Sequence, residues 1–187
     1  MSAALALIDE HGLGPFSIRT LAQRLGVAPM TIYVYFRTKE ELLEHVRALV
    51  LDGVEAPLSG VPDWQDQVAG FARRFHHNLT AHPGLVDLVV DELPGPMLDP
   101  VRESVVRTLR GAGFSSRDAV DAVAVVFSYV LGFAVARRAQ RATTSPGPEF
   151  PYLREAAAEY ARQLEPDTFE RGLADFITVF GNRRATG

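Results

Sequence analysis

The sequence predicts an all-α fold in two units, and two observations support this prediction. Along most of the 187 residues, apolar side chains recur at the three- and four-residue spacing of amphipathic helices, and no segment shows the alternation of a β-strand. A stretch rich in proline and glycine, 57–62, interrupts the helical pattern and is typical of a joint between two folding units. We therefore expect a small N-terminal helical unit followed by a larger one.

The N-terminal unit is predicted to contain four helices, at 2–11, 18–25, 29 to about 35, and 39 to about 54. Ser17 is a suitable N-cap for the second helix, and Gly26 ends it as a residue that tolerates positive φ. Pro29 suits the first turn of the third helix. Thr38, three residues before Glu41, has the pattern of a capping box for the fourth.

The larger unit is predicted to contain six helices, at 64–81, 84–91, 99 to 111 or 113, 115 to about 141, 152–164 and 168–182. Asp63 is the expected cap of the first of these, and Asp167 of the last. Ser115 with Asp118 begins the longest helix, which is followed by a flexible loop over 142–150.

The composition excludes several classes of protein. The chain has no cysteine, which excludes a disulfide framework, a thiolate metal site and a cysteine nucleophile. The apolar run 3–8 has no basic flank and is followed at once by two acidic residues, so we expect no signal peptide. The longest uncharged apolar stretch, 122–136, is shorter than the ~20 residues of a membrane span and predicts a buried helix. We expect a soluble, cytoplasmic protein.

Residues 17–36 have the pattern of a helix-turn-helix. Ala22 supplies the small side chain needed where the two helices cross, and Gly26, four residues later, supplies the positive φ needed in the turn. Four apolar residues are expected to hold the two helices together: Leu21, Leu25, Val27 and Ile32. Two ordinary core helices joined by a glycine would explain any one of these features, but they explain the combination poorly.

The charge distribution supports the same interpretation. The formal net charge is −4, yet no acidic residue lies between Glu10 and Glu40. That window carries a charge of +4, from Arg19, Arg24, Arg37 and Lys39, which leaves −8 for the rest of the chain. A local positive surface on an acidic chain is typical of phosphate binding, although four such charges also fit a solvated face.

Within this window the run LAxxLGVxxxTxYxxFxxKxxLL, from Leu21 to Leu43, resembles the DNA-binding domain of the TetR family of bacterial repressors. The resemblance is specific over 17–46 and extends less sharply into the rest of the chain. It implies a helix-turn-helix DNA-binding domain over 1–47 and an effector-binding and dimerisation domain over 48–187. The partners it implies are a double-stranded DNA operator, a small-molecule effector and a second copy of the chain.

The resemblance implies that the helix from residue 29 to 35 lies in the major groove. The candidate DNA-binding residues are Arg19, Thr20, Pro29, Met30, Thr31, Tyr33, Tyr35 and Lys39. The threonine and the two tyrosines after Met30 offer hydrogen-bonding groups to phosphates and base edges. Lys39 is similar to the family's phosphate-contacting lysine, and Arg19 is similar to an arginine that reaches a guanine edge. A solvated or phosphate-facing arginine is the alternative for Arg19.

Two departures from the family pattern limit what the resemblance implies. Pro29 stands where the tetracycline-binding members carry a glutamine that reads a base, so no operator preference is carried over. The basic arm that usually precedes the first helix is missing, which predicts either a naturally short arm or a truncation. We expect weaker nonspecific affinity for DNA as a result.

The helix over 119–136 is apolar on all sides, with Asp121 its only charge, and one small domain can hardly cover both of its faces. We therefore predict a homodimer in which this helix and the last one pair with their symmetry mates in a four-helix bundle, as the family does. The predicted interface residues are Val126, Tyr129, Phe133, Phe169, Leu173, Phe176 and Phe180. A core formed within one chain is the alternative.

An effector cavity is implied by the resemblance, with candidate lining residues Phe71, Phe75, Asn78, His82, Val105, Leu109, Phe127 and Leu131. Plain core is the alternative at any one of these positions. Phe71, Ser128 and Ala136 stand where the tetracycline-binding members carry asparagine, histidine and glutamate that contact the drug. This replacement argues for a more apolar or aromatic effector, whose binding would move the helix from residue 39 to 54 and change the half-site separation.

Other functions have weaker support. No nucleophile elbow or phosphate-binding loop follows a strand, so we predict no enzyme, no catalytic residue and no cofactor. His76, His77 and His82 lack the i, i+4 spacing of helical metal ligands, and we predict no metal site. The two alternatives are a regulator controlled by a protein partner instead of a small molecule and a small helical hydrolase or lyase that uses His82.

Overall fold

The computed structural model describes residues 2–51, 54, 63–91, 95, 98–139 and 147–186. Every regular element within these ranges is a helix, so the predicted all-α fold is confirmed. In chain order the helices are α1 Ser2–His11, α2 Ile18–Leu25, α3 Pro29–Tyr33, α4 Lys39–Leu51, α5 Trp64–Ala81, α6 Leu85–Asp91, α7 Asp99–Gly111, α8 Ser116–Ala139, α9 Pro151–Glu155, α10 Ala157–Ala161 and α11 Pro166–Thr186.

Several helix ends differ from the prediction. α3 ends at Tyr33, earlier than expected. α4 is described as far as Leu51, and the residues that follow it in the predicted helix, 52 and 53, lie outside the described residues. The helix predicted over 152–164 is broken at Ala156 into α9 and α10. The last helix begins at Pro166, because Glu165 supplies the carbonyl that accepts the first amide bonds, so Asp167 lies in the first turn instead of capping it. The predicted joint over 57–62 lies outside the described residues.

Of the predicted caps at Ser115 and Asp63 in the larger unit, one is confirmed and the other is not. The Ser115 hydroxyl accepts a hydrogen bond from the Asp118 amide at 3.1 Å and donates one to the Asp118 carboxylate, so the predicted start of α8 is confirmed. Asp63 stands at the N-cap position of α5, but its side chain makes no capping bond. Trp64 compensates at this end of the helix, since its ring is buried edge-on against Phe114 at 4.8 Å between centroids.

The helices enclose two hydrophobic cores. The first lies among α1, α2, α3 and α4, and the second among α5, α7, α8 and α11. α6 contributes to both, because Leu85 and Leu88 are buried in the first core whereas Val86 and Val89 are buried in the second. α4 also contributes to both, because its Leu51 is buried in the second core, so α4 and α6 together join the N-terminal unit to the larger one.

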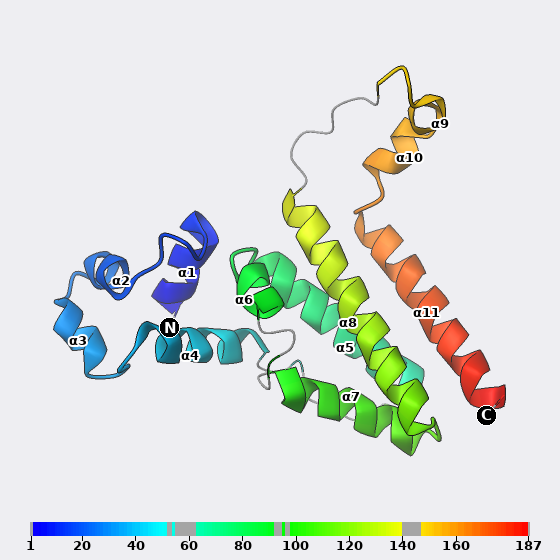
Figure 1. Cartoon of the computed structure of the whole chain (residues 1–187), viewed down its shortest axis with the longest axis horizontal. Coiled ribbons are helices and arrows are strands. Elements are labelled where there is room, and N and C mark those ends of the chain that lie inside the picture. Colours follow the sequence, from blue (N-terminus) through cyan, green and yellow to red (C-terminus); the bar gives the residue numbers. More distant parts are fainter. Residues whose placement is uncertain are drawn as a thin grey trace.

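α8 is the central helix of the larger unit and packs against α5, α7 and α11 (Figure 1). By length and composition Ser116–Arg138 is apolar enough to cross a membrane, but half of its most apolar window is buried inside the structure. Core helices pass the same test, so the burial agrees with the prediction of a buried helix.

Candidate nucleic-acid interface and effector core

Local hydrogen bonds define the helix-turn-helix formed by α2 and α3. The Ser17 hydroxyl accepts from the Thr20 amide at 3.1 Å, and the Thr20 hydroxyl accepts from the Ser17 amide at 2.9 Å, which completes a capping box. Gly26 ends α2 with φ 67°, in the left-handed region, as predicted. Because the Thr20 hydroxyl also donates to the Ser17 carbonyl at 2.8 Å, any DNA contact by Thr20 must compete with this cap.

The surface of α3 is unusually apolar. Large side chains stand exposed on it and just after it: Met30, Tyr33, Val34 and Tyr35. Val34 is 75% exposed and Tyr35 73%, whereas Ile32 is buried and anchors the helix to the first core. Soluble chains seldom leave such a concentration of apolar surface in water unless a partner covers it. Methyl groups suit contacts with thymine methyls, and phenol hydroxyls suit hydrogen bonds with base edges and phosphates.

The sequence-based prediction missed Val34. The helical pattern assigns a valine to a core position as readily as to a surface one, and the family motif leaves this position open. The burial of Ile32 explains the orientation of Val34, since a residue two positions further along a helix points away from the buried side. Pro29 and Thr31 are also exposed, so every candidate residue on α3 lies at the surface.

Three cations flank this apolar surface. Arg19 on α2 and Arg37 before α4 are exposed, and Lys39 in the first turn of α4 is partly exposed. Within the part of the chain that the structure describes, no ion pair engages these three side chains. The Lys39 ammonium lies 5.7 Å from the centroid of the Phe16 ring, an arrangement that steadies the cation without neutralising it.

Arg24 does not join them. Its guanidinium donates two hydrogen bonds to the Glu10 carboxylate of α1, and this contact holds the pKa of the Glu10 carboxyl below its usual value. The sequence separation of 14 residues hides this pair, because α1 and α2 become neighbours only in the folded unit. The acid-free window therefore presents three free positive charges to a polyanion instead of four.

The predicted apolar anchors of the helix-turn-helix are only partly confirmed. Leu21 and Ile32 are buried, but Leu25 is 48% and Val27 38% exposed. These two side chains line an open apolar cavity of about 300 Å³, together with Leu21, Ile32 and residues of α1, α3 and α4. The prediction for Leu25 and Val27 was wrong because the turn carries them to the rim of the first core.

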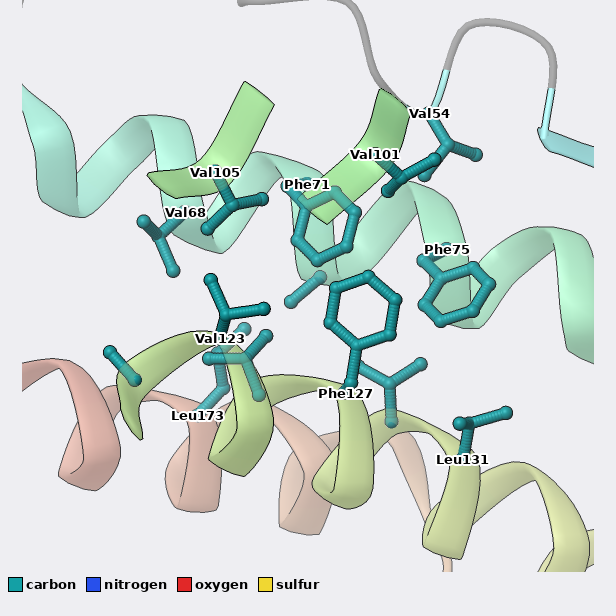
Figure 2. Packing of buried hydrophobic residues seen from close by; sticks show 14 of the residues in the cluster. Val54, Val68, Phe71, Phe75, Val101, Val105, Val123, Phe127, Leu131 and Leu173 are labelled. Atoms are coloured by element: carbon teal, nitrogen blue, oxygen red, sulfur yellow. The ribbon is translucent and has the colours of Figure 1, made fainter. Parts of the chain in front are cut away.

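Three phenylalanines form the centre of the second core. The Phe127 ring of α8 lies 5.4 Å from the rings of both Phe71 and Phe75 on α5, and those two are 5.9 Å apart (Figure 2). The other apolar candidates for the effector cavity surround them and are all buried: Val105, Leu109 and Leu131. The sequence-predicted residues therefore do come together, as a packed aromatic cluster.

The two polar candidates lie elsewhere. Nδ1 of His82 is 2.8 Å from the Asp9 carboxylate of α1, so this ring belongs to the contact between the two units and is not a polar group of the aromatic cluster. The prediction for His82 is corrected accordingly, because α5 ends at Ala81 and the chain turns there toward α1. Asn78 lies partly buried on α5, one helical turn after Phe75, and its cavity role stays a prediction.

Two polar groups outside the predicted cavity lining border the core. The Arg102 guanidinium of α7 lies 6.0 Å from the Phe127 ring centroid and donates to the Gly95 carbonyl and the Asp99 carboxylate. His76 was a weak candidate, and its ring stacks on Phe169 at 4.1 Å. Burial, reinforced by Arg137, lowers the pKa of His76. The apolar spacing on α7 identified Val105 and Leu109 but not Arg102, because a charged residue does not belong to the apolar pattern.

The seven candidate interface residues divide into two sets. Four are already buried within one chain, in the second core: Val126, Phe169, Leu173 and Phe180. They are corrected to core residues, since α5, α8 and α11 cover them and leave no surface for a partner. Tyr129, Phe133 and Phe176 keep part of their rings exposed. The Tyr129 hydroxyl donates to the Phe169 carbonyl at 2.9 Å, which fixes α8 against α11 within the chain.

Comparison with known proteins agrees with this arrangement. The family described as bacterial regulatory proteins, tetR family, matches residues 1–46, and the tetracyclin repressor-like C-terminal domain matches residues 56–178. The first match ends within α4, and the second covers α5 to α10 and most of α11. Both units of the fold are therefore represented, in the same order.

Three similar proteins span nearly the whole chain. An HTH-type transcriptional regulator of Saccharopolyspora erythraea is 31% identical over 100% of this chain and 74% of its own length. The tetracycline repressor protein class A from transposon 1721 of Escherichia coli is 31% identical over 97% of this chain and 88% of its own length. The Streptomyces coelicolor TetR family protein ActR, solved in complex with (S)-DNPA, is 26% identical, with a TM-score of 0.71 over 96% of this chain and 93% of that one.

Proposed function

The chain belongs to the TetR family of bacterial regulatory proteins, and we propose that it acts in the cytoplasm as a homodimeric repressor released from its operator by a small aromatic effector. Members of this family are transcriptional regulators, not enzymes. The observation that supports the DNA-binding role best is the exposed surface of α3, where Met30, Val34 and Tyr35 stand in water within the segment that carries the three cations. Covering that surface with a DNA groove explains both its apolar and its positive character.

A titration with DNA near physiological salt tests this role. One probe is the intergenic DNA that flanks the protein's own gene, and the control is a scrambled duplex of equal length. We expect a preference of ~10³-fold or more for the native probe, and footprinting then defines the operator. Weak and equal binding to both duplexes would contradict regulation at this site.

The dimer is proposed to form through the faces of α8 and α11 that stay exposed in one chain. On α8 these are small or apolar positions one turn apart: Val120, Ala124, Ser128, Gly132 and Val135. On α11 they are Ala174, Thr178 and Val179. Because small side chains let two helices approach closely, these faces suit a four-helix bundle made by two copies.

Gly132→Glu tests the dimer. A side chain at Gly132 meets no atom within 4 Å in the single chain, so the substitution leaves the fold intact and places a charge in the proposed interface. We expect the variant to sediment as a monomer while its helical circular dichroism is unchanged. Gly111→Glu, on α7 and equally free of neighbours, is the matched control and should sediment like the wild type. A dimeric Gly132→Glu variant would place the interface elsewhere.

The effector is proposed to bind beside the Phe71–Phe75–Phe127 cluster, with Arg102 as the polar contact. An aromatic molecule that carries a carboxylate would stack on the phenylalanine rings and pair with the guanidinium above Phe127. The ActR complex with (S)-DNPA supports a small-molecule site in a protein of this fold. A thermal-shift panel of aromatic acids is the direct test, with Arg102→Gln expected to weaken every positive response.

A regulator without a small-molecule effector is the second candidate. The close packing of the three phenylalanine rings supports it, because an effector would have to displace rings already in contact. The same panel separates the two candidates. Stabilisation by an aromatic acid that also lowers DNA affinity favours the effector, whereas DNA binding that no member of the panel changes favours control by a protein partner.

A further inference from the structure

The contact between α1 and α6 is built around one carboxylate, that of Asp9. Its Oδ2 lies 2.8 Å from Nδ1 of His82, and its Oδ1 accepts a hydrogen bond from the Gly84 amide at 3.1 Å. Gly84 immediately precedes α6, so Asp9 from the N-terminal unit satisfies a free amide at the start of a helix in the larger unit. Side chains within a helix's own sequence usually supply such a cap.

The backbones also approach closely at this place. A Cβ added to Gly84 would lie 2.3 Å from the Ile8 carbonyl oxygen and 2.8 Å from the Asp9 amide nitrogen. Both neighbours are backbone atoms of α1, which cannot move aside as a flexible side chain does. Only glycine permits this approach of the backbones. Gly84 and the Asp9 carboxylate therefore both contribute to the contact between α1 and the start of α6.

α6 also contacts α8 and the second core. The Asp87 carboxylate of α6 pairs with the Arg138 guanidinium at 2.7 Å, and Val86 and Val89 are buried in the second core. Leu85 and Leu88, on the opposite side of α6, are buried in the first core. α6 is therefore held from both sides, and its contact with α1 lies beside those of α4 with α5 and α6, which also connect the two units.

We propose that Asp9 is a positioning residue that fixes the DNA-binding unit on the larger unit and thereby sets the half-site spacing that the dimer recognises. This inference rests on the proposed function, since half-sites have a fixed spacing only for a dimer on DNA. Asp9 lies on α1, away from the α3 surface, and acts through the angle between the units. Loss of its two bonds leaves α3 intact and lets the two copies of α3 adopt a wider range of separations.

The readout is spacing selectivity, which a loss of stability alone does not change. The operator found by footprinting is compared with versions that carry one or two inserted base pairs between the half-sites. The spacing ratio is the affinity for the original operator divided by the affinity for an altered version. It is measured for the wild type, Asp9→Ala, Asp9→Asn and Glu10→Ala. Glu10→Ala is the matched control, because it removes a carboxylate from the same helix. The Glu10 carboxylate pairs with Arg24 inside the DNA-binding unit and not with the larger unit.

We expect Asp9→Ala to lower the spacing ratio about tenfold, the size of one charge-assisted hydrogen bond. Asp9→Asn has nearly the same shape and keeps an acceptor for the Gly84 amide, so its ratio should lie between those of Asp9→Ala and the wild type. Glu10→Ala should keep the wild-type ratio. If Asp9→Ala is poorly folded, Asp9→Asn alone decides, because a ratio equal to that of the wild type overturns the inference.

The outcomes separate the inference from the proposed function. In one outcome the wild type prefers one spacing, and Asp9→Ala and Asp9→Asn prefer it as strongly as the wild type does. That result overturns the role of Asp9 but leaves the proposed dimeric repressor unchanged. A wild-type chain without any spacing preference overturns both together. A reduced ratio in Asp9→Ala with an unchanged ratio in Glu10→Ala supports the inference.

Discussion

Phe127→Ala tests whether the aromatic cluster holds the larger unit together. The Phe127 side chain is 4% exposed, so nearly all of its apolar surface is lost from the core on truncation. Burial and the residual cavity together predict a loss of about 4 kcal/mol in the free energy of unfolding. The two ring contacts at 5.4 Å keep the loss above the lower end of the usual range of about 3–5 kcal/mol, since aromatic pairs add about 0.5–1.5 kcal/mol each beyond burial.

Urea unfolding followed by circular dichroism measures this loss, at one protein concentration for all samples because dimerisation links stability to concentration. Phe150→Ala is the matched control: Phe150 is exposed, and its truncation should change the free energy by less than about 0.5 kcal/mol. Toluene should stabilise Phe127→Ala and not the wild type, since an apolar cavity that stays dry binds apolar molecules. A loss below about 1 kcal/mol for Phe127→Ala would refute the packing argument.

Four further outcomes are expected. Lys39→Ala should weaken binding to operator and random DNA alike and reduce the salt slope by about one unit; an unchanged slope would show that Lys39 does not contact a phosphate. Tyr35→Ala should lower the ratio of operator to random affinity, and equal losses on both duplexes would exclude a base contact. Gly26→Ala should cost about 1 kcal/mol or more in urea unfolding, because alanine is strained at φ 67°, and an unchanged midpoint would contradict this. Burial and Arg137 lower the pKa of folded His76, so the unfolded chain takes up a proton first as pH falls below about 6.5, and stability should be lost there; His76→Phe should flatten this part of the profile.

Short-range signals predicted the local structure well. The Ser17 cap at the start of α2 and the left-handed glycine that ends this helix involve residues at most three or four positions apart, so the sequence contains every group that takes part. α1, α2 and α5 begin and end where the spacing of apolar residues places them. The family motif lies in the same stretch, which is why the α3 surface could be predicted almost completely.

Contacts between distant helices account for the errors. Arg24 looked like a free cation until α1 brought Glu10 against it, and His82 looked like a pocket residue until the end of α5 brought it to Asp9. The same reason explains Val126 on α8, whose exposure depends on how many neighbours cover an all-apolar helix. Periodicity shows that such a helix is buried, but it does not show whether a partner or the same chain buries it.

The charge balance bears directly on how this protein recognises DNA. With Arg24 engaged by Glu10, we expect each protomer to present Arg19, Arg37 and Lys39 to phosphates, which predicts a salt slope no steeper than about −5 for a dimer. The rest of the chain is acidic and adds no nonspecific attraction. Most of the discrimination must then come from the exposed side chains of α3 and from the spacing of the two copies. With few phosphate contacts to compensate a misplaced half-site, the contacts of α1 and α4 with the larger unit should matter strongly for binding.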